Sequence, residues 1–245
     1  MKISIIVATY NSDKTLKETL QSIHSQLFQD WECIVVDGNS KDRTIEIVEE
    51  FEKIDLRFRH ISEPDNGIYD AFNKGWRLAK GEWIYYLGSS DLLLPEGLEK
   101  LMSTNHRDAA IISGHVYAKM IDGVLKPGYS VDFTGSHQAK LTRRSVIEEF
   151  RGFDERFKLI ADEDLIWKIK DAGYKLDIVD AFVAVFMMGG ASSKFSSLFT
   201  FAKEYYCILK KYPHRVNHPL INVIKISMHD LGSIIYRRSR KILLG

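Results

Sequence analysis

The chain has 245 residues, of which 45% are apolar and 27% charged, a mixture typical of one globular α/β domain and not of a disordered or fibrous chain. Its two cysteines, Cys33 and Cys207, lie within apolar runs, so we expect both to be reduced, buried and inert. A structural zinc site is excluded because no group of Cys and His residues has the spacing of zinc ligands.

The apolar run Ile3–Ala8 is followed at once by polar residues. It is too short for the core of a signal peptide, and no later apolar stretch is long enough to span a bilayer. We therefore expect a cytoplasmic protein, with any membrane contact confined to the inner face of the membrane.

Charge is distributed unevenly along the chain, although the net charge is only +1. Residues 192–245 contain ten Lys or Arg and two Asp or Glu, a net charge of +8, which leaves −7 on the preceding residues. This asymmetry predicts a partner for the C-terminal segment. Peripheral docking on an anionic membrane through the basic run Ile234–Leu244 is one interpretation, and a solvated helix or an oligomer contact made by C-terminal helices is the other. Nucleic acid is not expected, because the segment does not interleave aromatic and cationic residues.

The first half of the chain alternates between strands and helices. Four strands are predicted over Ile3–Ala8, Glu32–Val36, Phe58–Ser62 and Trp83–Leu87. Between them, apolar residues recur at helical spacing in segments that begin near Leu16, Asp42 and Gly67. Repeated strand–helix units with short connections predict a mainly parallel central sheet flanked by helices.

The second half is less regular. Strands are predicted over Ala110–Val116 and Ile178–Phe186, and helices over Glu96–Met102 and Glu163–Ala172. From Ser196 onward the chain predicts two or three helices, interrupted near Pro213 and Pro219. We therefore expect one α/β domain over residues 1–190 and a basic helical extension over residues 191–245.

Polar residues gather where the predicted strands end, and these residues are Thr9, Tyr10, Asn11, Asp37, Asp65, Ser90 and Asp91. Ligands of parallel α/β sheets bind beyond the carboxyl ends of the strands. The sequence therefore predicts one composite site at this edge of the sheet.

Each carboxylate also has a simpler interpretation. Asp37 could accept hydrogen bonds from a base or ribose, or could cap the next helix. Asp91 could hold a divalent cation against a diphosphate, or could be a turn residue. Asp162, beside Glu163 and Asp164, could be a general base, or the three could simply complement the dipole of a helix, which their position favours.

A further group lies between the two halves of the chain. His137, Gln138 and Arg144 are candidates to contact a phosphate or an acceptor. A histidine in such a segment is more often an ordinary loop residue with satisfied hydrogen bonds.

The order of these segments resembles the GT-A-fold glycosyltransferases of family 2. The resemblance covers roughly residues 3–190 and is carried by seven segments in the family's order, namely Ser4–Asn11, Val35–Asp42, Ser62–Gly75, Ala79–Trp83, Leu87–Asp91, Gly152–Glu155 and Ala161–Leu165. The run Glu63–Asp70 and the pair His137–Gln138 look most like the branch found in bacterial polysaccharide gene clusters.

This resemblance implies roles for individual residues. Thr9 and Asp37 match positions that contact the nucleotide base and ribose, and Asp65 matches a further position on the nucleotide side. Asp91 matches the last acidic residue of the family's metal motif, and Asp162 matches the catalytic base of inverting transfer. The implied donor is a nucleotide-sugar, usually a UDP-sugar, used with Mn2+ or Mg2+. The implied acceptor is a hydroxyl of a glycan or of a lipid-linked molecule in surface polysaccharide biosynthesis.

The chain departs from the family pattern at the metal motif. Ser89 and Ser90 stand where the family commonly has a further Asp, so Asp91 is the one acidic residue left there. A cation with one protein carboxylate should be held weakly until the donor diphosphate arrives. Ala161 also replaces an acidic residue that often precedes the base. These departures keep open the alternative of a non-catalytic nucleotide-sugar-binding or scaffold subunit in a polysaccharide-assembly complex.

Two other nucleotide-using enzymes are disfavoured. A sugar-phosphate nucleotidyltransferase should have a Gly-rich loop with a basic residue after the first strand, where this chain has Ala8–Asn11. A dinucleotide oxidoreductase should have a Gly-x-Gly-x-x-Gly run after Val7, which is missing.

Overall fold

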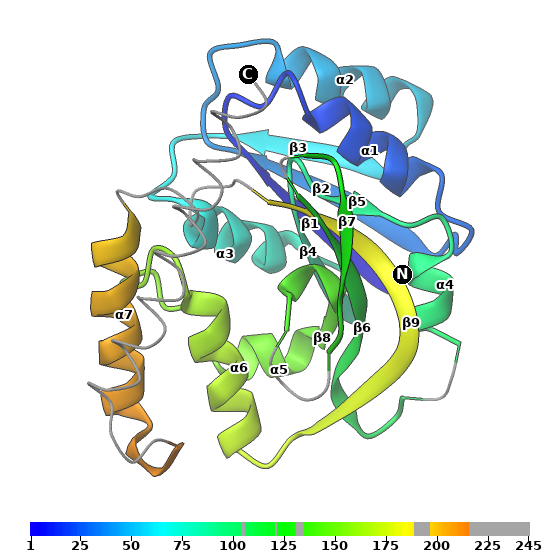
Figure 1. Cartoon of the computed structure of the whole chain (residues 1–245). Helices are drawn as coiled ribbons and strands as arrows, with labels where there is room; N and C mark the ends of the chain where they lie inside the picture. Colours follow the sequence, from blue (N-terminus) through cyan, green and yellow to red (C-terminus); the bar gives the residue numbers. More distant parts are fainter. Residues whose placement is uncertain (104–105, 121, 131–134, 189–196, 216–245) are drawn as a thin grey trace.

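The computed structural model describes residues 1–103, 106–120, 122–130, 135–188 and 197–215. Its centre is a nine-stranded sheet in the order β3-β2-β1-β4-β8-β6-β9-β5, with β7 paired to β6. Helices cover both faces of this sheet (Figure 1). The predicted α/β architecture is confirmed.

The first half forms the parallel part of the sheet. Its strands are β1 (Ile3–Thr9), β2 (Trp31–Asp37), β3 (Phe58–Ser62) and β4 (Trp83–Gly88). The helices between them are α1 (Leu16–His24), α2 (Thr44–Ile54) and α3 (Ile68–Leu78). All of these elements were predicted, and the register places Thr9 beside Asp37 and Ala8 beside Gly88. The carboxyl ends of β1, β2 and β4 therefore lie at one edge.

The second half adds antiparallel pairs. Its elements are β5 (Leu92–Leu93), α4 (Gly97–Leu101), β6 (Ala109–Lys119), β7 (Leu125–Gly128), the 3-10 turn η1 (His137–Ala139), β8 (Lys140–Arg143), α5 (Arg144–Glu149), α6 (Ala161–Asp171) and β9 (Lys175–Met187). Strand β8 runs antiparallel to β4 and β6, whereas β9 runs parallel to β6. The strands β5, β7 and β8 were not predicted, because two to four residues are too few to show a period.

Alternate residues of β1 enter different hydrophobic cores, as expected for a strand covered on both faces. Ile3, Ile5 and Val7 pack with α1, α2 and α4, whereas Ile6 and Ala8 pack with α3, α5 and α6. Figure 1 shows α1 and α2 on the side of the sheet opposite α3, α5 and α6. The edge of the sheet that holds the carboxyl ends of β1, β2 and β4 therefore has packed helices on both faces.

Helix α7 (Leu198–Lys211) is followed by the short turn η4 (Pro213–Arg215). The helix packs through Ile208 into the core that contains α3 and α6. Residues 189–196 are not described, so the boundary near residue 190 stays a prediction. The basic run Ile234–Leu244 also lies outside the described residues. Within the described part of the chain, no helix combines the length and the hydropathy that a membrane span needs.

The two cysteines differ in their environment. Cys33 is buried in β2, as predicted, and burial raises the pKa of its thiol well above the ordinary value. Cys207 is exposed, which corrects the prediction of a buried residue. The reason is the helical period of α7, which turns Ile208 into the core and leaves Cys207 on the outer face.

Candidate active site

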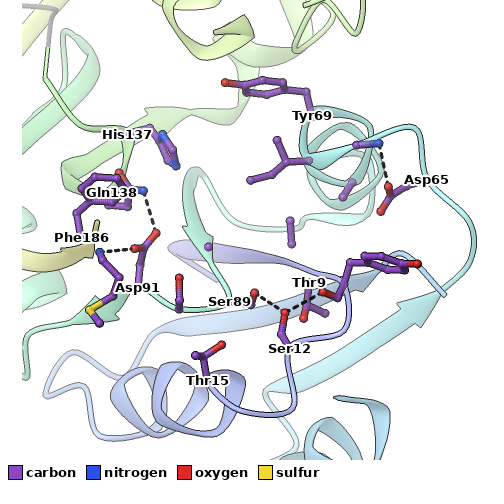
Figure 2. Close-up of a pocket in the computed structure, with 18 of the residues that line it drawn as sticks. Thr9, Ser12, Thr15, Asp65, Tyr69, Ser89, Asp91, His137, Gln138 and Phe186 are labelled. Carbon is purple, nitrogen blue, oxygen red and sulfur yellow. Dashed lines mark hydrogen bonds between the residues drawn. The ribbon is translucent and has the colours of Figure 1, made fainter. Parts of the chain in front are cut away.

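A cavity of about 600 Å³ opens at the carboxyl edge of the sheet. Its walls come from the ends of β1 and β4, the start of α3, the turn η1, the end of β9 and the segment at residues 158–159. Figure 2 shows Thr9, Asp65, Tyr69, Asp91, His137 and Phe186 around the hollow. Seven of the predicted site residues line it, namely Thr9, Tyr10, Asp65, Ser90, Asp91, His137 and Gln138.

Residues at the end of β1 form one wall. The Thr9 side chain is buried, and its Oγ1 has no hydrogen-bond partner among the described residues. Tyr10 lies at the mouth with 61% of its surface exposed. A buried hydroxyl without a hydrogen-bond partner lowers the stability of the folded protein. A polar ligand that supplies the missing hydrogen bond offsets this loss. The Thr9 hydroxyl is therefore a buried, unsatisfied polar group beside the cavity.

Asp37 lies behind this wall and is fully buried. Its Oδ2 accepts hydrogen bonds from the Ser40 backbone N–H at 2.9 Å and the Ser62 hydroxyl at 2.6 Å, and the Ser40 hydroxyl donates to its Oδ1. It does not cap α2, because that helix begins at Thr44 with Arg43 at the cap position. Asp37 therefore orders the turn over residues 38–40.

This turn approaches the cavity closely. A Cβ at Gly38 would lie 2.6 Å from the Asp65 carboxylate and 3.3 Å from the Tyr10 ring. Only a residue without a side chain leaves both groups in place. Asp37 thus orders a turn that lies against two cavity residues, without lining the cavity itself.

Two other predicted residues lie away from the cavity wall. Asn11 connects the loops that follow β1 and β2. Its backbone N–H donates to Ser40 Oγ at 2.7 Å, and its side-chain Oδ1 accepts from the Lys41 backbone N–H at 2.8 Å. Arg144 donates from Nε to the Gly81 carbonyl at 3.0 Å. Arg144 follows β8 at the amino end of β4, so the structure does not bring it to the site.

Asp91 forms the floor of the cavity. Gln138 Nε2 donates to its Oδ2 at 2.8 Å, and the Met187 N–H donates to its Oδ1 at 2.9 Å. Burial raises the pKa of Asp91, and these hydrogen bonds only partly offset that effect. A cation beside the carboxylate would favour its ionised form.

The surroundings of Asp91 offer few other metal ligands. Across the described ranges, no group of three or more Asp, Glu, His or Cys side chains could hold a metal ion. Ser89 and Ser90 line the cavity beside Asp91, and the Ser89 hydroxyl is 2.8 Å from that of Ser12. One carboxylate with hydroxyl neighbours fits a cation that takes its remaining ligands from a bound diphosphate and water.

Asp162 lies in the first turn of α6, as the helix-start interpretation expects. The Tyr69 hydroxyl is 2.6 Å from its Oδ1, and His137 Nδ1 is 3.1 Å from its Oδ2. Both partners line the cavity, and 27% of the Asp162 side chain is exposed. The two interpretations of this residue are therefore compatible.

The electrostatics of Asp162 favour its charged form. Burial raises its pKa, but the hydrogen bond and charge of His137 and the hydrogen bond from Tyr69 outweigh burial, so the pKa is lowered overall. Its neighbour Glu163 behaves oppositely, because burial and the charge of Asp162 raise the Glu163 pKa to about 7. Asp162 is thus an ionised carboxylate held at two points beside the cavity.

Several lining residues were missed at the sequence level. At the sequence level Tyr69 lies in the matched segment Ser62–Gly75 but has no role of its own, and nothing local marks Lys158, Phe186 or Met187. Lys158 Nζ donates to the Asn66 carbonyl at 3.1 Å and brings a cation to the wall. The Asn66-Gly67 turn signal and the resemblance over Glu63–Asp70 are the sequence cues to a site residue at Tyr69.

Comparison with known proteins identifies the family. Residues 4–164 match the model of glycosyl transferase family 2. A PGL/p-HBAD biosynthesis glycosyltransferase of Mycobacterium tuberculosis is 31% identical over 176 residues, which are 66% of each protein. The chondroitin synthase of Escherichia coli is 27% identical over 185 residues, 70% of this chain and 27% of that protein. The chain thus spans less than two thirds of the length of these relatives.

Two solved structures show the same fold. S. aureus TarS 1-349, in complex with UDP-GlcNAc, matches with a TM-score of 0.68 at 22% identity, over 85% of this chain and 65% of that one. The mannosyltransferase PcManGT of Pyrobaculum calidifontis, in complex with GDP-Man and Mn2+, matches with a TM-score of 0.71 at 17% identity. This match covers 100% of the present chain and 76% of PcManGT. Together with the family match, these findings confirm the expected resemblance: the chain belongs to glycosyl transferase family 2 and has the GT-A fold.

Proposed function

We propose that the protein is an inverting glycosyltransferase that moves a sugar from a nucleotide-sugar, most simply a UDP-sugar, to an acceptor hydroxyl. The observation that carries this proposal is the setting of Asp162. Two residues of the cavity wall, Tyr69 and His137, each hold one of its oxygens, and its lowered pKa keeps it ready to accept a proton.

The donor would occupy the cavity. A volume of about 600 Å³ lies within the range usual for small-molecule sites. The nucleotide would lie against Thr9, Tyr10 and Asp65, with Asp37 behind them, so Asp37 contributes by ordering the turn at Gly38. One fold neighbour was solved with UDP-GlcNAc and another with GDP-Man, which supports a nucleotide-sugar of this kind.

The diphosphate would lie over Asp91. Mn2+ or Mg2+, when bound there, neutralises the charge that builds on the leaving diphosphate. Asp91 would supply the protein carboxylate, and the Ser89 and Ser90 hydroxyls lie beside it. Lys158 offers a second positive charge from another wall of the same cavity.

In the transfer step, the acceptor oxygen bonds to the anomeric carbon while the bond from that carbon to the diphosphate oxygen breaks. Asp162 takes the proton of the acceptor hydroxyl, and the single displacement inverts the anomeric configuration. A carboxylate with a lowered pKa is a modest base. The placement of the two reactants in one cavity should therefore contribute more than basicity does.

The acceptor is proposed to be a hydroxyl of a glycan or lipid-linked molecule in surface polysaccharide biosynthesis. The basic C-terminal segment would bring a cytoplasmic enzyme to the membrane where such an acceptor lies. Names of relatives that act in chondroitin and PGL/p-HBAD synthesis support a glycan or glycolipid product.

One observation favours a second candidate. The serines at positions 89 and 90 leave Asp91 as the one acidic residue of its motif, which suits a nucleotide-sugar-binding subunit without turnover. A panel of UDP-, GDP- and dTDP-sugars, with and without Mn2+, separates the two functions. A thermal shift accompanied by release of the nucleoside diphosphate supports the transferase, and a shift without release supports the binding subunit.

A further inference from the structure

Helix α7 lies beyond the residues that match the family model, yet one of its side chains contacts the segment that forms part of the cavity wall. The Glu204 carboxylate is buried in the contact between α7 and the segment that precedes α6. One of its oxygens accepts the backbone N–H of Lys158 at 2.7 Å, and the other accepts that of Leu159 at 3.0 Å. These two residues form part of the cavity wall.

The same segment contacts the group that holds Asp162. The Leu159 carbonyl is 2.9 Å from the Tyr69 hydroxyl, and that hydroxyl is 2.6 Å from Asp162 Oδ1. A phenolic hydroxyl has one hydrogen, so Tyr69 donates to one of these two oxygens at a time. The ionised carboxylate is the stronger acceptor, and the carbonyl remains as the alternative once Asp162 has taken a proton.

We propose that Glu204 is a positioning residue for Asp162, acting through the backbone of residues 158–159 and the hydroxyl of Tyr69. The proposal rests on the proposed function, in which Asp162 is the base. Residues 157–159 have no helical or strand hydrogen bonding of their own. The two backbone N–H groups that donate to the Glu204 carboxylate therefore fix where the Leu159 carbonyl lies. That carbonyl is the second acceptor within reach of the Tyr69 hydroxyl, so its position affects how fully the hydroxyl donates to Asp162.

A second set of contacts joins the C-terminal end of α7 to the first turn of α6. Lys211 Nζ lies 2.7 Å from the buried Asp164 carboxylate, and the Tyr212 hydroxyl lies 3.1 Å from the same oxygen. Asp164 shares the first turn of α6 with Asp162. The helix therefore contacts the chain on both sides of the base, and Glu204 is the contact that leads to the reacting group.

The test is a double-mutant cycle on full-length protein. Its probe is release of UDP, with water as acceptor, from the UDP-sugar that gives the largest thermal shift in the donor panel. The variants are Glu204→Gln, Tyr69→Phe and the double variant, with Lys203→Gln on the exposed face of α7 as the matched control. Thermal unfolding of every variant is measured alongside.

Glu204→Gln should lower kcat about tenfold and change the donor KM less, because it misplaces the base. Of the proposed donor contacts, Lys158 alone lies on the segment that Glu204 holds. In the Tyr69→Phe background, the same change should alter kcat by less than about twofold, since the intermediary is already missing. Lys203→Gln should behave as wild type. If Glu204→Gln does not fold, Glu204→Asp replaces it and should show a smaller loss that also vanishes in the Tyr69→Phe background.

An equal loss from Glu204→Gln in both backgrounds, or no loss in either, would overturn the proposal. Asp162→Asn in the same series separates its failure from that of the proposed function. If Asp162→Asn is inactive and Glu204→Gln lowers kcat equally in the wild-type and Tyr69→Phe backgrounds, only the role of Glu204 is refuted. Full UDP release by Asp162→Asn refutes the base assignment as well.

Discussion

His137 and Asp162 lie 25 positions apart and meet behind the wall of the cavity, where His137 lines the cavity and its Nδ1 is 3.1 Å from Asp162 Oδ2. An ionised carboxylate can only accept, so the histidine carries its hydrogen on Nδ1. Its other nitrogen, Nε2, is buried and has no hydrogen-bond partner in the part of the chain that the structure describes. The histidine thus donates its hydrogen bond to Asp162, while its charge also lowers the pKa of Asp91.

Replacing His137 should shift the pH dependence of the reaction. The histidine lowers the pKa of Asp162. Activity requires the ionised base and is lost as the pH falls through that pKa. His137→Ala should therefore raise the pKa and move the acidic limb of the kcat profile to higher pH, which steady-state rates between pH 4 and 8 would show.

Glu163→Gln is the matched control for this shift. It removes a negative charge beside Asp162 and the group whose pKa is about 7. The acidic limb should then stay in place or move to lower pH. Identical profiles for wild type and His137→Ala would show that the histidine does not tune the base.

Adding a carboxylate at the metal motif should strengthen metal binding before the donor arrives. Ser90→Asp places a second acid beside Asp91 in the cavity. We expect Mn2+ affinity without donor to rise at least about tenfold, because each added carboxylate contributes an oxygen ligand and a negative charge. Calorimetric titration of Mn2+ measures this, and Ser90→Asn is the uncharged control. Equal affinities in wild type and Ser90→Asp would mean that Asp91 is not part of a metal site.

Removing the carboxylate of Asp37 should weaken nucleotide binding. Asp37→Ala leaves the Ser40 and Ser62 hydroxyls without their acceptor and loosens the turn at Gly38. We expect UDP affinity to fall about tenfold and the melting temperature to fall as well, as is usual when a buried hydrogen-bond network loses its charged member. Ser62→Ala removes one hydrogen bond and should have a smaller effect. Unchanged calorimetric affinity for UDP in Asp37→Ala would contradict the assignment.

The basic C-terminal segment should carry the membrane contact. Its four cations between positions 237 and 241 could each add about 1 kcal/mol near an anionic leaflet. Full-length protein should co-sediment with vesicles containing phosphatidylserine, less so at high salt, and a chain lacking residues 230–245 should not. Equal sedimentation of the full-length and shortened proteins would show that the segment does not bind the membrane. Light scattering would then test whether it mediates oligomerisation.

Features that depend on residues close together in the sequence were predicted well. The parallel half of the sheet and the cavity residues Thr9 and Asp91 follow from short motifs at strand ends, because strand direction alone brings those ends to one edge. The strands with two to four residues escaped prediction, since they form only against partners far along the chain.

The contacts that hold Asp162 could not be predicted from the sequence. Tyr69 and Asp162 are 93 positions apart, and the Met187 N–H reaches Asp91 across 96 positions. Such contacts depend on how α3, α6 and β9 pack, which no local pattern encodes. For the same reason Arg144, a candidate by sequence, lies at the opposite edge of β4 from the cavity.

The measurement that tests the central claim most directly is donor turnover by Asp162→Asn. The amide keeps the shape of the side chain but cannot take a proton, so kcat should fall at least about a hundredfold, while UDP affinity and the melting temperature stay near wild-type values. A turnover rate close to wild type in a folded Asp162→Asn protein would contradict the assignment of Asp162 as the base.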